Sequence, residues 1–153
     1  MSRAPQIAVI GGGGEDPRAA ELAEEVGRRL AEAGAVVVCG GLGGVMAAAA
    51  RGASEAGGTV IGIVPSDDPE DANPHCTHVV AAATGVARNI AVVSSAHAVI
   101  AIGGRWGTLT EIAHARNIGR PVITLESWPA LGEGIEVVGH PEAAVAAALA
   151  GRH

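Results

Sequence analysis

One short segment, residues 103–111, combines a turn of the phosphate-binding type with a carboxylate one helical turn further on. It reads Gly-Gly-Arg-Trp-Gly-Thr-Leu-Thr-Glu and directly follows the apolar run 98–102. A buried strand that ends in glycines and continues into a helix opening with Thr108 leaves several backbone N–H groups directed at one point. Such a point favours an anion, so the segment predicts a phosphate site on residues 103–108.

Two other glycine-rich turns, residues 11–14 and 40–44, also follow strand-like runs. Because the carboxyl ends of parallel strands lie at one edge of a sheet, we expect all three turns to meet at one crevice. In the two earlier turns, Asp16 and Met46 occupy the place of the third glycine of the dinucleotide fingerprint, which favours a monophosphate over NAD. Each turn taken alone can be interpreted equally well as a tight connection between a strand and a helix. The three turns together favour a ligand site.

Arg88 and Glu111 are the side chains best suited to act on a bound anion, and each has a structural alternative. Arg88 is expected at a helix start, where a cation opposes the helix dipole, so an anionic ligand would explain it. The alternative is a surface ion pair with an acid such as Asp67. Glu111 ends the sequence Thr-Leu-Thr-Glu, which fits a capping box on Thr108. The functional reading places its carboxylate beside the ligand, where it stabilises an oxocarbenium-like transition state or activates water.

The composition excludes several classes of protein. All ten basic residues are arginine, so a Walker-type NTPase and any Schiff-base chemistry, including pyridoxal-phosphate decarboxylation, are excluded. The formal net charge of -6, with two Trp, no Tyr and no Phe, argues against nucleic acid as a partner. The two cysteines form no disulfide framework, and Cys39 is interpreted as a small buried hydrophobe. His75, Cys76 and His78 match no standard zinc spacing, so we expect a surface loop and no metal there.

Apolar runs typical of strands alternate with helical patterns along the chain. The strand-like runs are residues 7–10, 35–39, 60–64, 78–82, 98–102 and 121–125, and the clearest helices are 17–33, 44–56 and 141–150. The alternation predicts an α/β fold: a Rossmann-like, doubly wound and mainly parallel sheet with helices on both faces, in a single domain spanning residues 1–153. The long connection 65–77 is expected to be functional. No apolar run approaches the ~20 residues of a membrane span and no signal segment precedes the first strand, so we expect a cytoplasmic protein with no membrane partner.

The motif at residues 103–111 resembles the Gly-Gly-x-x-Gly-Thr-x-x-Glu signature of the Lonely Guy superfamily, once mislabelled as lysine decarboxylases. Residues 38–46 resemble the other glycine-rich element of that superfamily. In its phosphoribohydrolases an Arg and the motif Glu are the catalytic pair, and Arg88 and Glu111 match them. That resemblance implies hydrolysis of the N-glycosidic bond of a nucleoside 5′-monophosphate, such as AMP to adenine and ribose 5-phosphate. The chain departs from those enzymes at Ile102, where they have Pro, and at Asn89, where they have Lys.

Other features are more similar to the branch of the molybdenum-cofactor carrier proteins, which bind a pterin monophosphate. They are Asn73-Pro74, Thr84-Gly85, Arg88-Asn89 and the proline-free Gly-Gly motif. This resemblance implies binding of a phosphorylated purine or pterin, with the molybdenum cofactor as cargo and no cofactor otherwise required. It also implies a homo-oligomer, a dimer or tetramer.

The turns, the pair Arg88 and Glu111, and the resemblance together define the candidate ligand site. Trp106 has two readings, stacking on the bound ring or packing at a subunit contact. The candidate ligand-binding residues are Gly11, Gly12, Gly13, Gly40, Gly41, Gly43, Gly44, Met46, Arg88, Asn89, Gly103, Gly104, Arg105, Trp106, Gly107, Thr108 and Glu111.

Overall fold

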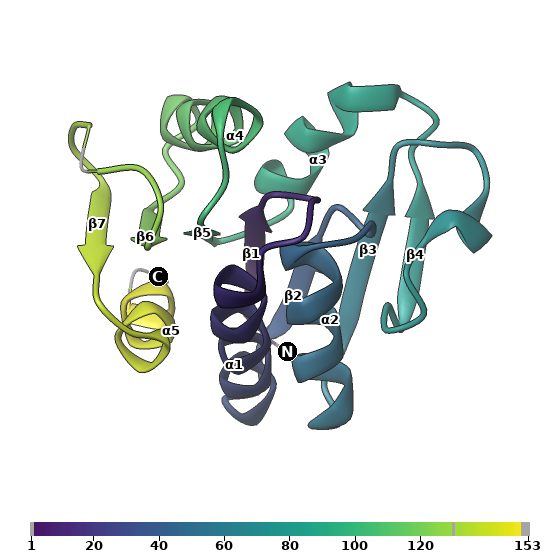
Figure 1. Cartoon of the computed structure of the whole chain (residues 1–153), viewed down its shortest axis with the longest axis horizontal. Coiled ribbons are helices and arrows are strands. Elements are labelled where there is room, and N and C mark those ends of the chain that lie inside the picture. Colours follow the sequence, from purple (N-terminus) through teal and green to yellow (C-terminus); the bar gives the residue numbers. More distant parts are fainter. Residues whose placement is uncertain (1, 130, 151–153) are drawn as a thin grey trace.

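A twisted parallel sheet forms the centre of the molecule (Figure 1). The structure is a computed structural model that describes residues 2–129 and 131–150, so the predicted domain of residues 1–153 includes five residues outside the described part. The sheet has seven strands in the order β4-β3-β2-β1-β5-β6-β7, and every pair of neighbours is parallel. The strands are β1 (Gln6–Gly11), β2 (Val36–Cys39), β3 (Val60–Val64), β4 (His78–Ala81), β5 (Ala98–Ile102), β6 (Val122–Leu125) and β7 (Ile135–Val138).

Helices cover both faces of this sheet. Figure 1 shows α1, α2 and α5 on one face and α3 and α4 on the other. Their bounds are α1 (Pro17–Glu32), α2 (Val45–Glu55), α3 (Arg88–Ser94), α4 (Trp106–Asn117) and α5 (Pro141–Ala150), with short 3-10 turns η1 (Pro69–Asp71) and η2 (Gly85–Ala87). The predicted Rossmann-like α/β fold is therefore confirmed, with a wholly parallel sheet. None of the helices in the described ranges combines the length and apolar character that a membrane crossing requires.

Successive side chains of a strand point to opposite faces of the sheet, which explains why the core is divided into two layers. In β1, Ile7 and Val9 belong to the core beneath α1, α2 and α5, whereas Ala8 and Ile10 belong to the core beneath α3 and α4. All four side chains are at most 2% exposed. A central strand buried on both faces needs apolar residues at every position, which is why this run shows no polar alternation.

One strand was not predicted from the sequence. β7 pairs with β6 at the edge of the sheet, and its middle residues, Glu136 and Val137, are exposed. Because this strand is half-buried at its two ends and exposed in its middle, its sequence lacks the continuous apolar character that identified the other strands.

Helices α1 and α2 pack with their backbones in direct contact. Asp16 caps α1 by accepting a hydrogen bond from the Ala19 N–H at 3.1 Å, and Pro17 occupies its first turn. A Cβ atom on Gly27 of α1 would overlap the carbonyl oxygen of Ala49, and one on Gly52 of α2 would overlap that of Glu24. These two glycines therefore allow α2 to lie close to α1, which determines the position of the N-terminus of α2 in the fold.

We expect Gly27→Ala to lower the free energy of unfolding by roughly 1–3 kcal/mol, because the added methyl group must push α1 away from α2. Denaturation by urea measures the effect. Gly107→Ala is the matched control: Gly107 is also helical, but a Cβ there meets open space, so stability should be unchanged or raised by up to about 1 kcal/mol. Equal stability of the two variants would contradict packing by backbone contact.

Candidate functional site

A cavity of about 350 Å³ opens at the carboxyl ends of the central strands. It lies where the chain reverses its direction across the sheet, between β1 and β5, the usual position of a ligand in a doubly wound fold. Its size is within the range of small-molecule sites. The residues that line it are Val9, Ile10, Gly11, Gly12, Gly13, Gly14, Gly40, Met46, Arg88, Asn89, Arg105, Gly107, Thr108 and Glu111.

The turn from β5 into α4 forms one wall of the cavity. Gly103 and Gly104 have φ angles of 57° and 86°, and a Cβ on Gly104 would overlap the side chain of Thr108. Only glycine fits there, because the left-handed backbone and the close approach exclude a side chain. Loop residues after β6 hold the turn: the Ser127 hydroxyl donates to the carbonyl of Gly103, and Trp128 Nε1 donates to the carbonyl of Arg105 at 3.0 Å.

Helix α4 begins at Trp106, two residues before the predicted start at Thr108. Arg105 is its N-cap residue, and the first bond of the helix runs from the Leu109 N–H to the Arg105 carbonyl. The N–H groups of the first turn have no partner within the helix and remain available to a ligand. Because Thr108 is already the third helical residue, the proposed capping box between Thr108 and Glu111 is wrong.

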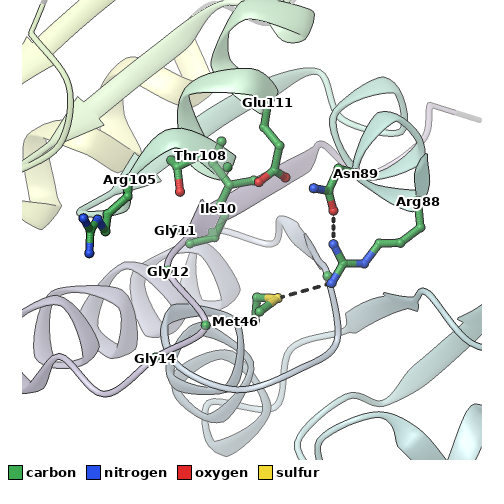
Figure 2. A pocket seen from close by; sticks show the side chains of 14 residues that line it. Ile10, Gly11, Gly12, Gly14, Met46, Arg88, Asn89, Arg105, Thr108 and Glu111 are labelled. Atoms are coloured by element: carbon green, nitrogen blue, oxygen red, sulfur yellow. Dashed lines mark hydrogen bonds between the residues drawn. The ribbon is translucent and has the colours of Figure 1, made fainter. Parts of the chain in front are cut away.

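Glu111 instead points into the cavity from the second turn of α4 (Figure 2). Burial raises the pKa of its carboxyl group to about 7, against the opposing effect of the Arg88 guanidinium. Near neutral pH the group is therefore divided between its charged and protonated forms. It can accept a proton or donate one without a large change in pH.

Arg88, the first residue of α3, lies across the cavity from Glu111. Its Nη1 donates to Asn89 Oδ1, its Nη2 lies 4.0 Å from Met46 Sδ, and its Nε is buried without a hydrogen-bond partner. Burial lowers the pKa of Arg88, and the Glu111 carboxylate opposes that shift. None of the ion pairs in the described part of the chain involves Arg88, so the alternative of a pair with Asp67 is wrong.

The loop after β1 and the turn after β2 approach each other backbone to backbone. The Val45 N–H donates to the carbonyl of Gly12 at 3.0 Å, and a Cβ on Gly44, at φ 63°, would overlap the same carbonyl. Gly40 contacts the cavity more directly, since its Cβ would lie 2.6 Å from Met46 Sδ and 2.9 Å from Arg88 Nη2. The glycines of these loops thus bring their backbones together and leave the cavity open.

Most of the predicted ligand-binding residues line this cavity, and six of them do not. The residues outside the lining are Gly41, Gly43, Gly44, Gly103, Gly104 and Trp106, whose binding roles remain predictions. The Trp106 side chain is 69% exposed and lies 5.1 Å from Trp128, measured between ring centroids, at an interplanar angle of 46°.

Two lining residues, Val9 and Ile10, were not predicted from the sequence, and Gly14 was predicted only as part of the turn 11–14 and not as a ligand-binding residue. Val9 and Ile10 belong to the buried part of β1, which the sequence marks only as core. The loop 65–77 also contributes: Asn73 donates from its side chain to the Leu42 carbonyl at 2.9 Å and from its backbone to the Gly41 carbonyl at 2.8 Å. It thereby holds the turn after β2.

A second hollow of about 400 Å³ shares Gly13 and Gly14 with the cavity. The charged residues that line this hollow are Glu15, Asp16 and Arg51. Arg51 forms an ion pair with Glu24, with 2.6 Å between Nη2 and Oε2. Two carboxylates and a paired arginine make this hollow a poor place for a phosphate. A phosphate is better accommodated in the first cavity.

Comparison with known proteins shows relatives over nearly the whole chain. A model of the SLOG cluster4 family matches residues 4–148. An uncharacterized protein of Archaeoglobus fulgidus is 42% identical over 140 residues, which are 92% of this chain and 91% of that protein.

Solved structures show the same relationship. The molybdenum cofactor binding protein from Rippkaea orientalis is 31% identical, with a TM-score of 0.92 and 98% of each chain covered. The molybdenum cofactor carrier protein from Chlamydomonas reinhardtii is 29% identical, with a TM-score of 0.90 over 97% of this chain and 98% of that one. These matches confirm the resemblance to the carrier branch, and the chain belongs to the SLOG cluster4 family.

Proposed function

We propose that this protein binds a phosphorylated purine or pterin, with a cargo of the molybdenum cofactor type. The observation that carries the proposal is Arg88, whose guanidinium lines the cavity, has a buried Nε without a partner and forms no ion pair among the described residues. The Arg88 side chain is half-buried, and withdrawing a cation from water is costly unless an anion compensates its charge. The two solved relatives, described as binding and carrying the molybdenum cofactor, support the choice of cargo.

The charges around the cavity favour an anion although the whole chain is acidic. The formal net charge of the protein is -6, but the charged residues of the cavity lining are Arg88, Arg105 and Glu111. Since Glu111 is partly protonated near pH 7, the lining is positive. The N-terminal turn of α4 adds unpaired N–H groups and the positive end of a helix dipole. We therefore place the ligand phosphate on the backbone of residues 103–108, with Arg88 as a further anion contact.

The glycine loop after β1 provides a surface for the flat ring of the ligand. Residues 11–14 present no side chains to the cavity, so a fused heterocycle can lie against their peptide groups. Met46 contributes a polarizable thioether on the adjoining wall. Peptide groups and a thioether accept a purine or a pterin alike, so the site selects a phosphorylated heterocycle as a class.

We expect Arg88→Met to weaken binding of AMP and of a pterin monophosphate roughly 10- to 100-fold, the effect of losing a charged hydrogen-bond donor. Isothermal titration calorimetry measures the affinities. Arg28→Met is the matched control, because Arg28 is paired with Glu32 at 2.9 Å outside the cavity lining, and its binding should equal that of the unmodified protein. Unchanged affinity in Arg88→Met would contradict the proposal.

A second candidate function, hydrolysis of a nucleoside 5′-monophosphate, is favoured by Glu111. Its carboxyl group faces Arg88 across the cavity and has a pKa of about 7, which suits a general acid at neutral pH. In this reaction the oxygen of a water molecule bonds to the anomeric carbon as the N-glycosidic bond breaks, and the base leaves with a proton from Glu111. The proton that the water loses then restores the acid form of Glu111. The products are the free base and ribose 5-phosphate, with the phosphate still on the turn before α4.

If Glu111 is that acid, AMP hydrolysis should slow as the pH rises through about 7, because the carboxyl group loses the proton it must donate. Chromatography of free adenine measures the rate, and Glu111→Gln should abolish it while AMP still binds. A rate that rises through pH 7, or that persists in Glu111→Gln, would contradict this role. Binding without adenine release at any pH would leave the protein a carrier and exclude the hydrolase.

A further inference from the structure

The two cysteines, far apart in the sequence, meet beneath the ligand cavity. Cys39 ends β2 and is paired with Gly62 of β3, so the side-chain positions of these two residues lie side by side on one face of the sheet. The place that a Cβ on Gly62 would occupy is filled by Cys76, whose Sγ lies 2.5 Å from it. Cys76 therefore packs against Cys39, in the same core cluster, and both are free thiols. Gly62 is the residue that makes room for this pair.

The two thiols differ in the way that thiol–disulfide exchange requires. Cys39 is buried, whereas Cys76 is half-buried in the loop 65–77. The hydrogen bond between the thiols lowers the pKa of Cys76, and partial burial opposes this effect. The same hydrogen bond raises the pKa of Cys39, and burial raises it further. Cys76 is thus the accessible nucleophile and Cys39 the protected partner.

The pair is connected to the ligand site through neighbouring residues on both sides. Gly40, next to Cys39, contacts Arg88 and Met46 in the cavity wall. Asn73, three residues before Cys76, is hydrogen-bonded to the carbonyl groups of Gly41 and Leu42. Any movement that draws Cys39 and Cys76 together acts on both segments.

We propose that Cys39 and Cys76 form a reversible disulfide that weakens ligand binding in the cavity. The effect on ligand binding rests on the proposed function. The Cys76 thiolate attacks one sulfur of a small disulfide such as oxidised glutathione and releases one thiolate. The Cys39 thiol then loses its proton, attacks the Cys76 sulfur and releases the second. The protein loses two electrons and two protons, and the small disulfide is reduced to two thiols.

We expect formation of the bond to move the backbone next to Arg88. A disulfide holds its sulfur atoms about 2.05 Å apart, closer than two thiols in contact. Because Cys39 and Cys76 approach each other, Gly40 shifts relative to the Arg88 guanidinium and Met46. The reduced protein is therefore the binding form and the oxidised protein the releasing form.

The experiment equilibrates the full chain in mixtures of reduced and oxidised glutathione and measures two quantities. Mass spectrometry should show an intramolecular disulfide, and the affinity for AMP or a pterin monophosphate should fall on the order of tenfold on oxidation and recover on reduction. Cys76→Ser and Cys39→Ala are the controls, and the affinity of neither should respond to the mixture.

Other outcomes separate the two proposals. A protein that gains only a glutathione adduct, or one whose disulfide leaves the affinity unchanged, overturns the redox inference while ligand binding stands. A response that persists in either single-cysteine variant overturns it as well. If the reduced protein binds neither ligand, the proposed function fails, and the coupling of the disulfide to binding fails with it.

Discussion

Direct contact between backbones is the constraint on which the whole site depends. The loop after β1 touches the start of α2, where a Cβ on Gly44 would overlap the Gly12 carbonyl, and a Cβ on Gly11 would overlap the carbonyl of Ile102 at the end of β5. Three strand ends are held this close because their turns carry almost no side chains. The cavity is the space that remains, and its walls combine the peptide groups of these glycines with side chains such as Met46, Arg88 and Glu111.

The same arrangement shows how an acidic protein could accept the anion that we propose as its ligand. Within the cavity lining, the charged side chains are two arginines and a carboxyl group with a pKa near 7, and the first turn of α4 adds its N–H groups. Burial lowers the pKa of Arg88 and raises that of Glu111, and the attraction between the two groups opposes both shifts. A phosphate that compensates Arg88 also favours the protonated form of Glu111. The proposed binding and the proposed proton transfer would thus use the same two side chains.

The sequence was sufficient to predict the fold and the glycine loops, because apolar runs and glycine turns are local signals. It did not reveal β7, whose exposed residues hide the pattern, nor the true start of α4. The Thr-x-x-Glu spacing looked like a capping box, but the position of the helix start depends on Gly103 and Gly104 and on Ser127 and Trp128 from the next loop. The meeting of Cys39 and Cys76 was missed for the same reason, since it depends on the pairing of β2 with β3 and the absence of a side chain at Gly62.

The central claim is that a ligand phosphate lies on the first turn of α4 while the ring lies on the loop after β1. Titration of the isotopically labelled protein with AMP, or with a pterin monophosphate, followed by the amide signals in NMR spectra, tests this claim most directly. The largest shifts are expected at the amides of Trp106, Gly107 and Thr108, with a second group at residues 11–14. Shifts confined to residues outside these two segments, or no shifts with either ligand, would contradict the account.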